Sequence, residues 1–116
     1  MAATKSYTTA TWASGSATAS GTTNTISTST YYGMTWYVKM VIVGTPTSGG
    51  TFIVQQSPDG STLYNGPTYT VPYAAGTYYW EIALDPTCQL TDLIYVAEGG
   101  GTSSTLTAQL GYISGI

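Results

Sequence analysis

Residues 33–44 read Gly-Met-Thr-Trp-Tyr-Val-Lys-Met-Val-Ile-Val-Gly, and this stretch decides the fold class. Large apolar side chains stand at every second position. They are Met34, Trp36, Val38, Met40 and Ile42, and they alternate with Thr35, Tyr37 and Lys39. Because successive side chains of a β-strand point to opposite faces, the alternation predicts a strand with one face in a core.

Four further segments predict strands of the same kind. They are residues 51–56, 77–84, 90–97 and 105–113, and β-branched and aromatic residues dominate their apolar positions. Turn-forming residues separate them, so that strands recur about every 8 to 14 residues. The pattern predicts a single all-β domain, an antiparallel β-sandwich of jelly-roll or immunoglobulin-like type with seven or eight strands.

A tight hairpin is predicted at Ser57-Pro58-Asp59-Gly60. Proline presets the first turn residue, aspartate tolerates the second, and glycine takes the left-handed position that follows. Residues 61–64 are then expected to form the return strand. Pro67 and Pro72 cannot donate to a central ladder, so residues 66–73 should lie on a sheet edge or in a bend between sheets.

The first 30 residues are poor in apolar side chains, and after Met1 only Tyr7, Trp12 and Ile26 are large. Strands are expected around residues 7–13 and 22–29. The opening 20 residues either add a first strand to the sandwich or form an arm that orders against a partner. In the second case Trp12 is the expected anchor.

The charged residues are few: no histidine, Lys5 and Lys39 as the only basic residues, five carboxylates, and a net charge of -3. Without histidine, Ser-His and Cys-His nucleophiles are excluded and metal ligands are scarce. The chain has little cationic charge for phosphates, and no apolar run approaches the roughly 20 residues of a membrane-spanning helix. We therefore expect no enzyme activity, no cofactor, no nucleic-acid partner and no membrane partner.

The remaining reactive side chains have simpler interpretations. Glu81 and Asp92 could serve a glycosidase as a carboxylate pair, but their strand positions favour solvated side chains. Asp59 and Asp85 belong to turns, and no Asp-x-Asp spacing supports calcium. Cys88, the one cysteine, has no cationic neighbour and is expected to fill space. The unpaired thiol and the missing apolar leader predict synthesis in a reducing cytoplasm.

Two predicted strands are apolar on both faces. Val41 and Val43 accompany the inward residues of one strand, and Ile94 and Val96 accompany those of another. Contiguous exposed apolar patches are uncommon on monomers, so a covering partner is expected. These four residues and Trp12 are the candidate interaction sites, and a homo-oligomer is expected.

Two aromatic runs, Tyr31-Tyr32 and Tyr78-Tyr79-Trp80, suggest a different function. Exposed rings can stack on sugars, which makes a carbohydrate-binding module an alternative. Alternation turns Tyr78 and Trp80 toward the core and leaves only Tyr79 free, so core packing is favoured.

The order of these segments resembles small β-sandwich virion proteins of tailed bacteriophages. The resemblance depends on residues 33–40, on the strand that ends in Gln56 and leads directly into the turn at residues 57–60, and on the Gly-rich linker before the last strand. It implies a non-enzymatic virion protein made in the host cytoplasm, above all a capsid decoration (cement) protein on the capsid exterior. The implied partner is the major capsid protein or another virion protein, and a trimer is preferred because such proteins often occupy threefold positions. A tail or fibre protein is the second interpretation.

Overall fold

The computed structural model describes residues 4–11, 20–44, 49–72, 74–97 and 105–114. The strands are β1 (Thr4–Thr9), β2 (Gly21–Thr22), β3 (Ile26–Ser27), β4 (Tyr31–Ile42), β5 (Thr51–Ser57), β6 (Tyr64–Thr70), β7 (Gly76–Ala83), β8 (Leu90–Val96) and β9 (Thr105–Ser114). None of the described ranges contains a helix able to cross a membrane.

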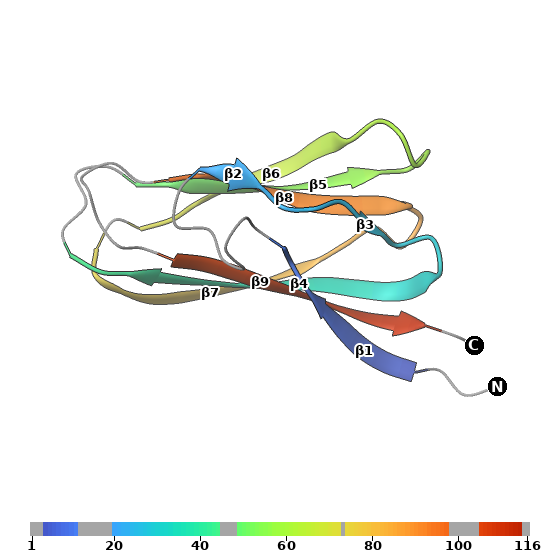
Figure 1. The fold of residues 1–116 in the computed structure, drawn as a ribbon, viewed down its shortest axis with the longest axis horizontal. Coiled ribbons are helices and arrows are strands. Elements are labelled where there is room, and N and C mark those ends of the chain that lie inside the picture. The colour runs from blue at the N-terminus through green and yellow to red at the C-terminus, as the bar shows by residue number, and fades with distance from the viewer. Residues whose placement is uncertain (1–3, 12–19, 45–48, 73, 98–104, 115–116) are drawn as a thin grey trace.

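Two antiparallel sheets form two layers (Figure 1). Sheet A has the order β1-β9-β4-β7, and sheet B has the order β2-β8-β5-β6, with β3 also paired to β8. If β2 and β3 are counted as one interrupted strand, the eight strands run 1-8-3-6 in one sheet and 2-7-4-5 in the other. This is the strand order of a jelly roll. The predicted β-sandwich is confirmed.

The core lies between the sheets and contains the apolar set of residues 33–44, as predicted. Met34, Trp36, Val38, Met40 and Ile42 are all buried, and they meet Phe52, Val54, Leu93 and Tyr95 of sheet B. Trp36 Nε1 donates to Thr91 Oγ1 at 3.0 Å, and the Thr91 hydroxyl donates to the Gln55 carbonyl at 2.8 Å. A hydrogen-bonded chain thus links β4 of one sheet to β8 and β5 of the other.

The hairpin turn forms as predicted, but the return strand begins later. Gly60 has the expected left-handed conformation, with φ 77°. Asp59 Oδ1 accepts the backbone N–H groups of Ser61 and Thr62, each at 2.9 Å, so these groups face the turn instead of a ladder. The predicted strand over residues 61–64 is therefore wrong, and β6 begins only at Tyr64. As predicted for residues 66–73, β6 lies at a sheet edge.

The N-terminal strands also differ from the expectation. β1 covers Thr4–Thr9, so it begins earlier than the expected residue 7, and residues 10 and 11 do not continue it. Residues 12 and 13 of the expected range lie outside the described residues. β1 pairs with β9 from Thr4 opposite Ser114 to Thr9 opposite Gln109. The single strand expected over residues 22–29 is wrong. Thr23 Oγ1 accepts the Leu93 N–H at 2.9 Å, so a side chain replaces a ladder carbonyl and divides the strand into β2 and β3.

Candidate functional site

The two outer faces of the sandwich are the candidate functional surfaces, and strand register assigns their side chains. The sheet A face consists of Lys5, Tyr7, Thr9, Thr35, Tyr37, Lys39, Val41, Thr77, Tyr79, Glu81, Ala83, Thr105, Thr107, Gln109, Gly111 and Ile113. The sheet B face consists of Thr22, Ser27, Thr51, Ile53, Gln55, Asn65, Thr68, Thr70, Leu90, Asp92, Ile94 and Val96.

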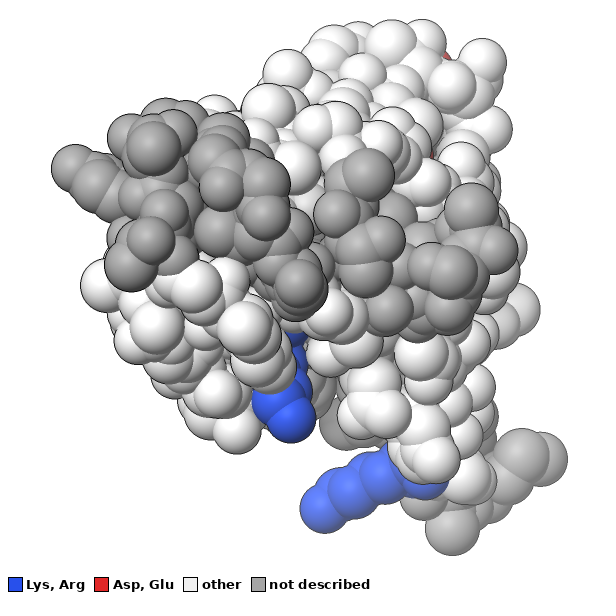
Figure 2. All heavy atoms as spheres, turned by 60° about the vertical axis from the view of Figure 1, so that its left-hand side comes forward, with Lys and Arg blue, Asp and Glu red and all other residues white. Residues whose placement is uncertain are grey.

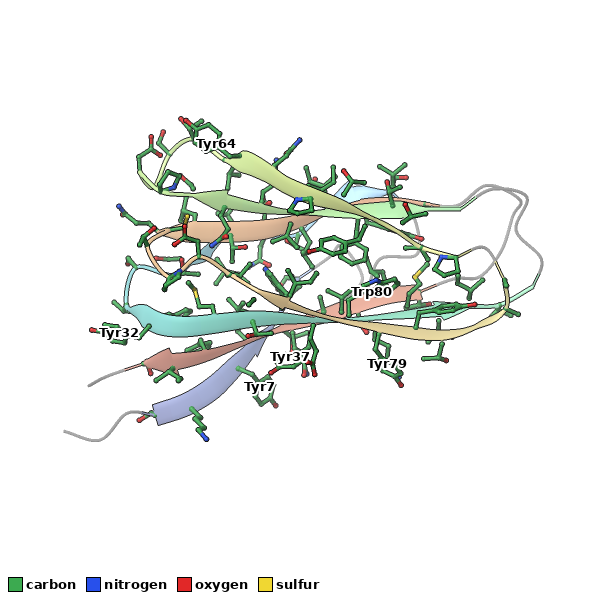
Figure 3. The ribbon with its side chains drawn as sticks, turned by 180° about the vertical axis from the view of Figure 1, so that it is seen from behind. Tyr7, Tyr32, Tyr37, Tyr64, Tyr79 and Trp80 are labelled. Atoms are coloured by element: carbon green, nitrogen blue, oxygen red, sulfur yellow. The ribbon has the colours of Figure 1, made fainter. Side chains whose placement is uncertain are left out.

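Three tyrosines project from the sheet A face. Tyr7 is 66% exposed, Tyr37 49% and Tyr79 71%, and they come from β1, β4 and β7. Figure 3 shows all three pointing away from the sandwich on the same side. The Tyr37 ring lies over β9, because a Cβ atom placed on Gly111 would be only 3.0 Å from Tyr37 Cε2. The Tyr37 ring therefore packs against the backbone of Gly111.

Hydrogen-bonding and charged groups surround the tyrosines. Gln109 is the register partner of both Thr9 and Tyr37, and Lys39 is the partner of Tyr79. No described residue forms a hydrogen bond with the Gln109 amide. Both lysines of the chain belong to this face, and in Figure 2 they project from the lower part of the molecule, where sheet A lies.

Two open hollows cover much of the sheet A face. One has a volume of about 650 Å³ and is lined by residues that include Lys5, Tyr7 and Gly111. The other has a volume of about 590 Å³ and is lined by residues that include Lys39 and Tyr79. Tyr37 and Gln109 line both of them, so the hollows adjoin at the centre of the face.

The sheet B face has a different character. Ile53 and Ile94 are register partners and half-buried, and Val96 at the end of β8 is 51% exposed. The amide Nε2 of Gln55 donates to Asn65 Oδ1 at 2.6 Å, so these two side chains are paired across β5 and β6. Among the described residues, this face has no exposed charged side chain.

Asp92 is the one carboxylate assigned to the sheet B face, and it is only 2% exposed. Its Oδ1 has no hydrogen-bond partner among the described residues. Burial removes water from the carboxylate and thereby disfavours the charged form, which raises the pKa of Asp92 to about 6. The group is thus a source of instability at neutral pH.

The structure divides the predicted interaction residues between the two faces. Val41 and Val43 lie on the side of sheet A, where Val43 is 52% exposed, and Ile94 and Val96 lie on the sheet B face. The strands that carry them, β4 and β8, end at the same end of the sandwich (Figure 1). Because Val41 and Ile94 face opposite sides of the sandwich, the two pairs do not form one flat surface, even though they lie near the same end. Trp12 lies outside the described residues.

The four carboxylates that the structure describes do not gather into a site. Glu81 and Asp92 lie on opposite faces and form no pair. Asp59 and Asp85 accept turn hydrogen bonds, which hold the pKa of each below its usual value. Burial, with a smaller contribution from Asp85, raises the pKa of the Cys88 thiol. No three potential metal ligands come together in the described part of the chain.

The two aromatic runs behave largely as their alternation predicts. Tyr31 stacks on Tyr112 with ring centroids 3.7 Å apart, and Trp80 meets Phe52 edge-on at 5.0 Å. The Tyr78 hydroxyl donates to the Ala74 carbonyl, and Tyr79 is exposed. Sequence reasoning missed the grouping of Tyr79 with Tyr7 and Tyr37. The outward position of Tyr37 was visible in the alternation, but the grouping depends on the order of strands in sheet A.

No protein family model matches the chain, and no curated protein matches its sequence. Among solved structures, the chain is similar to the SPBc2 prophage-derived protein YomS, with a TM-score of 0.54 and 11% sequence identity. The match covers 98% of this chain and 96% of that one. At this identity the likeness shows a shared fold across nearly the whole length of both proteins.

Proposed function

We propose that the chain is a non-enzymatic structural protein of a bacteriophage particle and, within that class, a capsid decoration (cement) protein on the capsid exterior. The observation that carries the proposal is the sheet B face. Its described residues expose no charge and present Ile53, Ile94 and Val96 to solvent. The centres of protein interfaces are depleted in charged residues in the same way.

Two further observations support the choice of a phage particle. The shared fold with a prophage-derived protein agrees with a phage origin. The jelly roll is also a common architecture of viral capsid domains. The sequence resemblance to small virion proteins of tailed phages points in the same direction.

In this proposal the sheet B face binds the major capsid protein across the junction between neighbouring subunits. Docking removes the apolar side chains from water, which contributes about 25 cal/mol for each Å² of apolar surface buried. A protein that binds only the assembled shell stabilises that shell by mass action. A homotrimer on a threefold position would engage three such faces at once and add avidity.

The first test locates the protein in the particle. Heads and tails of the parent phage are separated on a density gradient, and the protein is quantified in each fraction by mass spectrometry. Recovery with heads, in a fixed ratio to the major capsid protein, supports the proposal. Recovery with tails would assign a tail or fibre role instead, and absence from both fractions would contradict a virion protein.

The second test identifies the attaching face with a matched pair of variants. Val96 is the last residue of β8 in sheet B and is 51% exposed, whereas Val43 directly follows β4 of sheet A and is 52% exposed. A buried, unpaired charge is costly, so Val96→Lys should weaken binding to heads that lack the protein roughly tenfold or more. Val43→Lys should change binding less than about twofold. Thermal unfolding verifies that both variants fold, and an equal loss in both would refute the use of the sheet B face.

A further inference from the structure

We propose that the sheet A face binds a neutral carbohydrate chain, laid along the two hollows that adjoin at Tyr37. The site lies on the side of the molecule opposite the proposed capsid contact. The inference is therefore independent of the capsid assignment.

The first argument is the presentation of the aromatic rings. Gly111 has no Cβ, and this lets the Tyr37 ring rest on β9 while remaining half exposed. Tyr7 is the register partner of Gly111, so it stands beside this ring, and Tyr79 follows on β7. Side chains that only filled a core would not be exposed in this way. Such rings offer flat apolar surfaces to the C–H faces of sugars.

The second argument is size. Hollows of about 650 and 590 Å³ each fall within the range of roughly 300 to 1,000 Å³ that is typical of small-molecule sites. Because they adjoin at Tyr37 and Gln109, together they form an elongated site. An extended chain of several sugar units suits this shape better than one compact ligand.

The third argument is the set of polar groups between the rings. The Gln109 amide offers both donors and an acceptor, and no described residue occupies them. Thr9 and Thr107 add hydroxyls in the second hollow. Sugar hydroxyls donate and accept hydrogen bonds, so they complement an amide and hydroxyls more fully than a hydrocarbon ligand would.

The charges of the face favour a neutral, hydrated ligand. Lys5, Lys39 and Glu81 give a formal charge of +2 − 1 = +1, which is too small for a polyanion such as nucleic acid. Lys39 and Glu81 both line the second hollow, beside Tyr79. A dry protein contact would remove these two charges from water at a cost of several kcal/mol per ion. A polysaccharide in an open hollow leaves both groups hydrated.

The test is affinity electrophoresis of the full chain through gels that contain dextran, β-glucan, xylan or polygalacturonate, supported by an array of neutral and acidic glycans. At least one neutral polymer should retard the protein. Tyr37→Ala and Tyr79→Ala should each weaken that binding roughly tenfold, since each removes one stacking ring. Tyr64→Ala is the matched control, because Tyr64 is 60% exposed on β6 of the other sheet.

Gly111→Ala provides a second variant that keeps every ring. The added methyl group displaces the Tyr37 ring, so binding should fall while the fold, followed by thermal unfolding, persists. The proposal fails if no neutral polymer or glycan binds, if polygalacturonate alone retards the protein, or if Tyr64→Ala weakens binding as much as Tyr37→Ala. A dimer that Tyr37→Ala dissociates would assign the face to a second copy of the chain instead. Tyr37→Ala should leave binding to phage heads unchanged. A loss of carbohydrate binding in this variant can then be distinguished from a loss of capsid binding.

Discussion

The two outer faces of the sandwich cover the same core but differ in chemistry. The sheet A face has exposed tyrosines, both lysines, one glutamate, and the side-chain amide of Gln109, to which no described residue is hydrogen-bonded. The sheet B face has paired amides, threonines, half-buried isoleucines and a buried aspartate. The inward residues of a strand determine how it packs in the core. The outward residues determine which ligand or protein its exposed face can bind. The two proposals rest on this difference, with a hydrated ligand on the sheet A face and a dry protein contact on the sheet B face.

The largest expected difference in stability is between changing Asp92 on the sheet B face and changing Glu81 on the sheet A face. Asp92→Asn should stabilise the protein by about 2 to 3 kcal/mol near pH 8, because burial raises the pKa of Asp92 from 3.8 to about 6. Below about pH 3 the carboxyl is protonated in the folded and the unfolded states, and the gain should vanish. As the pH rises from about 4 to 6, the unfolded chain ionises first, so the folded state of the natural protein loses stability. Urea unfolding of the natural protein and of Asp92→Asn near pH 8 and near pH 3 measures the effect.

Glu81→Gln is the control for the aspartate, because Glu81 is exposed on the sheet A face. Its effect should stay within about 0.5 kcal/mol. If Asp92→Asn gave the same change at low and high pH, its cause would be packing and not charge, and the contrast between the two faces would lose its electrostatic basis.

The hydrogen-bonded link between the sheets predicts the next effect. Thr91→Val should destabilise the protein by about 2 kcal/mol, because Trp36 Nε1 would lose its acceptor inside the core. Thr107→Val removes a hydroxyl from the sheet A face and should cost less than about 0.5 kcal/mol. Denaturant titration compares the two. A loss for Thr91→Val no larger than that for Thr107→Val would contradict the importance of this link.

One glycine in each sheet gives the smallest pair of effects. A Cβ on Gly66 of β6 would lie 2.8 Å from the Val54 carbonyl oxygen, which is backbone and cannot easily move. Gly66→Ala should therefore cost about 1 to 2 kcal/mol. Gly111→Ala meets the Tyr37 ring, a side chain that is 49% exposed and has room to shift, and should cost less than about 1 kcal/mol. Thermal unfolding ranks the pair, and the reverse order would show that the Tyr37 ring is held rigidly.

Most of the fold could be predicted from local alternation. Residues 33–44 identified their own inward side chains, and the turn at Gly60 has the predicted conformation. The errors arose where side chains take over backbone hydrogen bonds. Asp59 captures two N–H groups after the turn, and Thr23 captures the Leu93 N–H. Neither of these side-chain hydrogen bonds can be recognised from the pattern of apolar residues.

The candidate site was much harder to predict. Alternation correctly left Tyr79 free, yet its grouping with Tyr37 and Tyr7 requires β4 to lie between β7 and β9, with β1 beyond. These contacts join strands distant in the chain, and periodicity within one strand does not contain them. The burial of Asp92 was equally hidden, because its position is an outward one in the alternation.

The pairing of β1 with β9 places Thr4 directly opposite Ser114. A short peptide bridge could therefore join the two ends of the described chain into a ring without disturbing either sheet. New ends could then be opened at the exposed Asp59–Gly60 turn, which would give a circular permutant with the same strand pairing. The same adjacency suits the domain for insertion into a surface loop of another protein, where it would add a compact module and barely change the spacing of the host's loop ends.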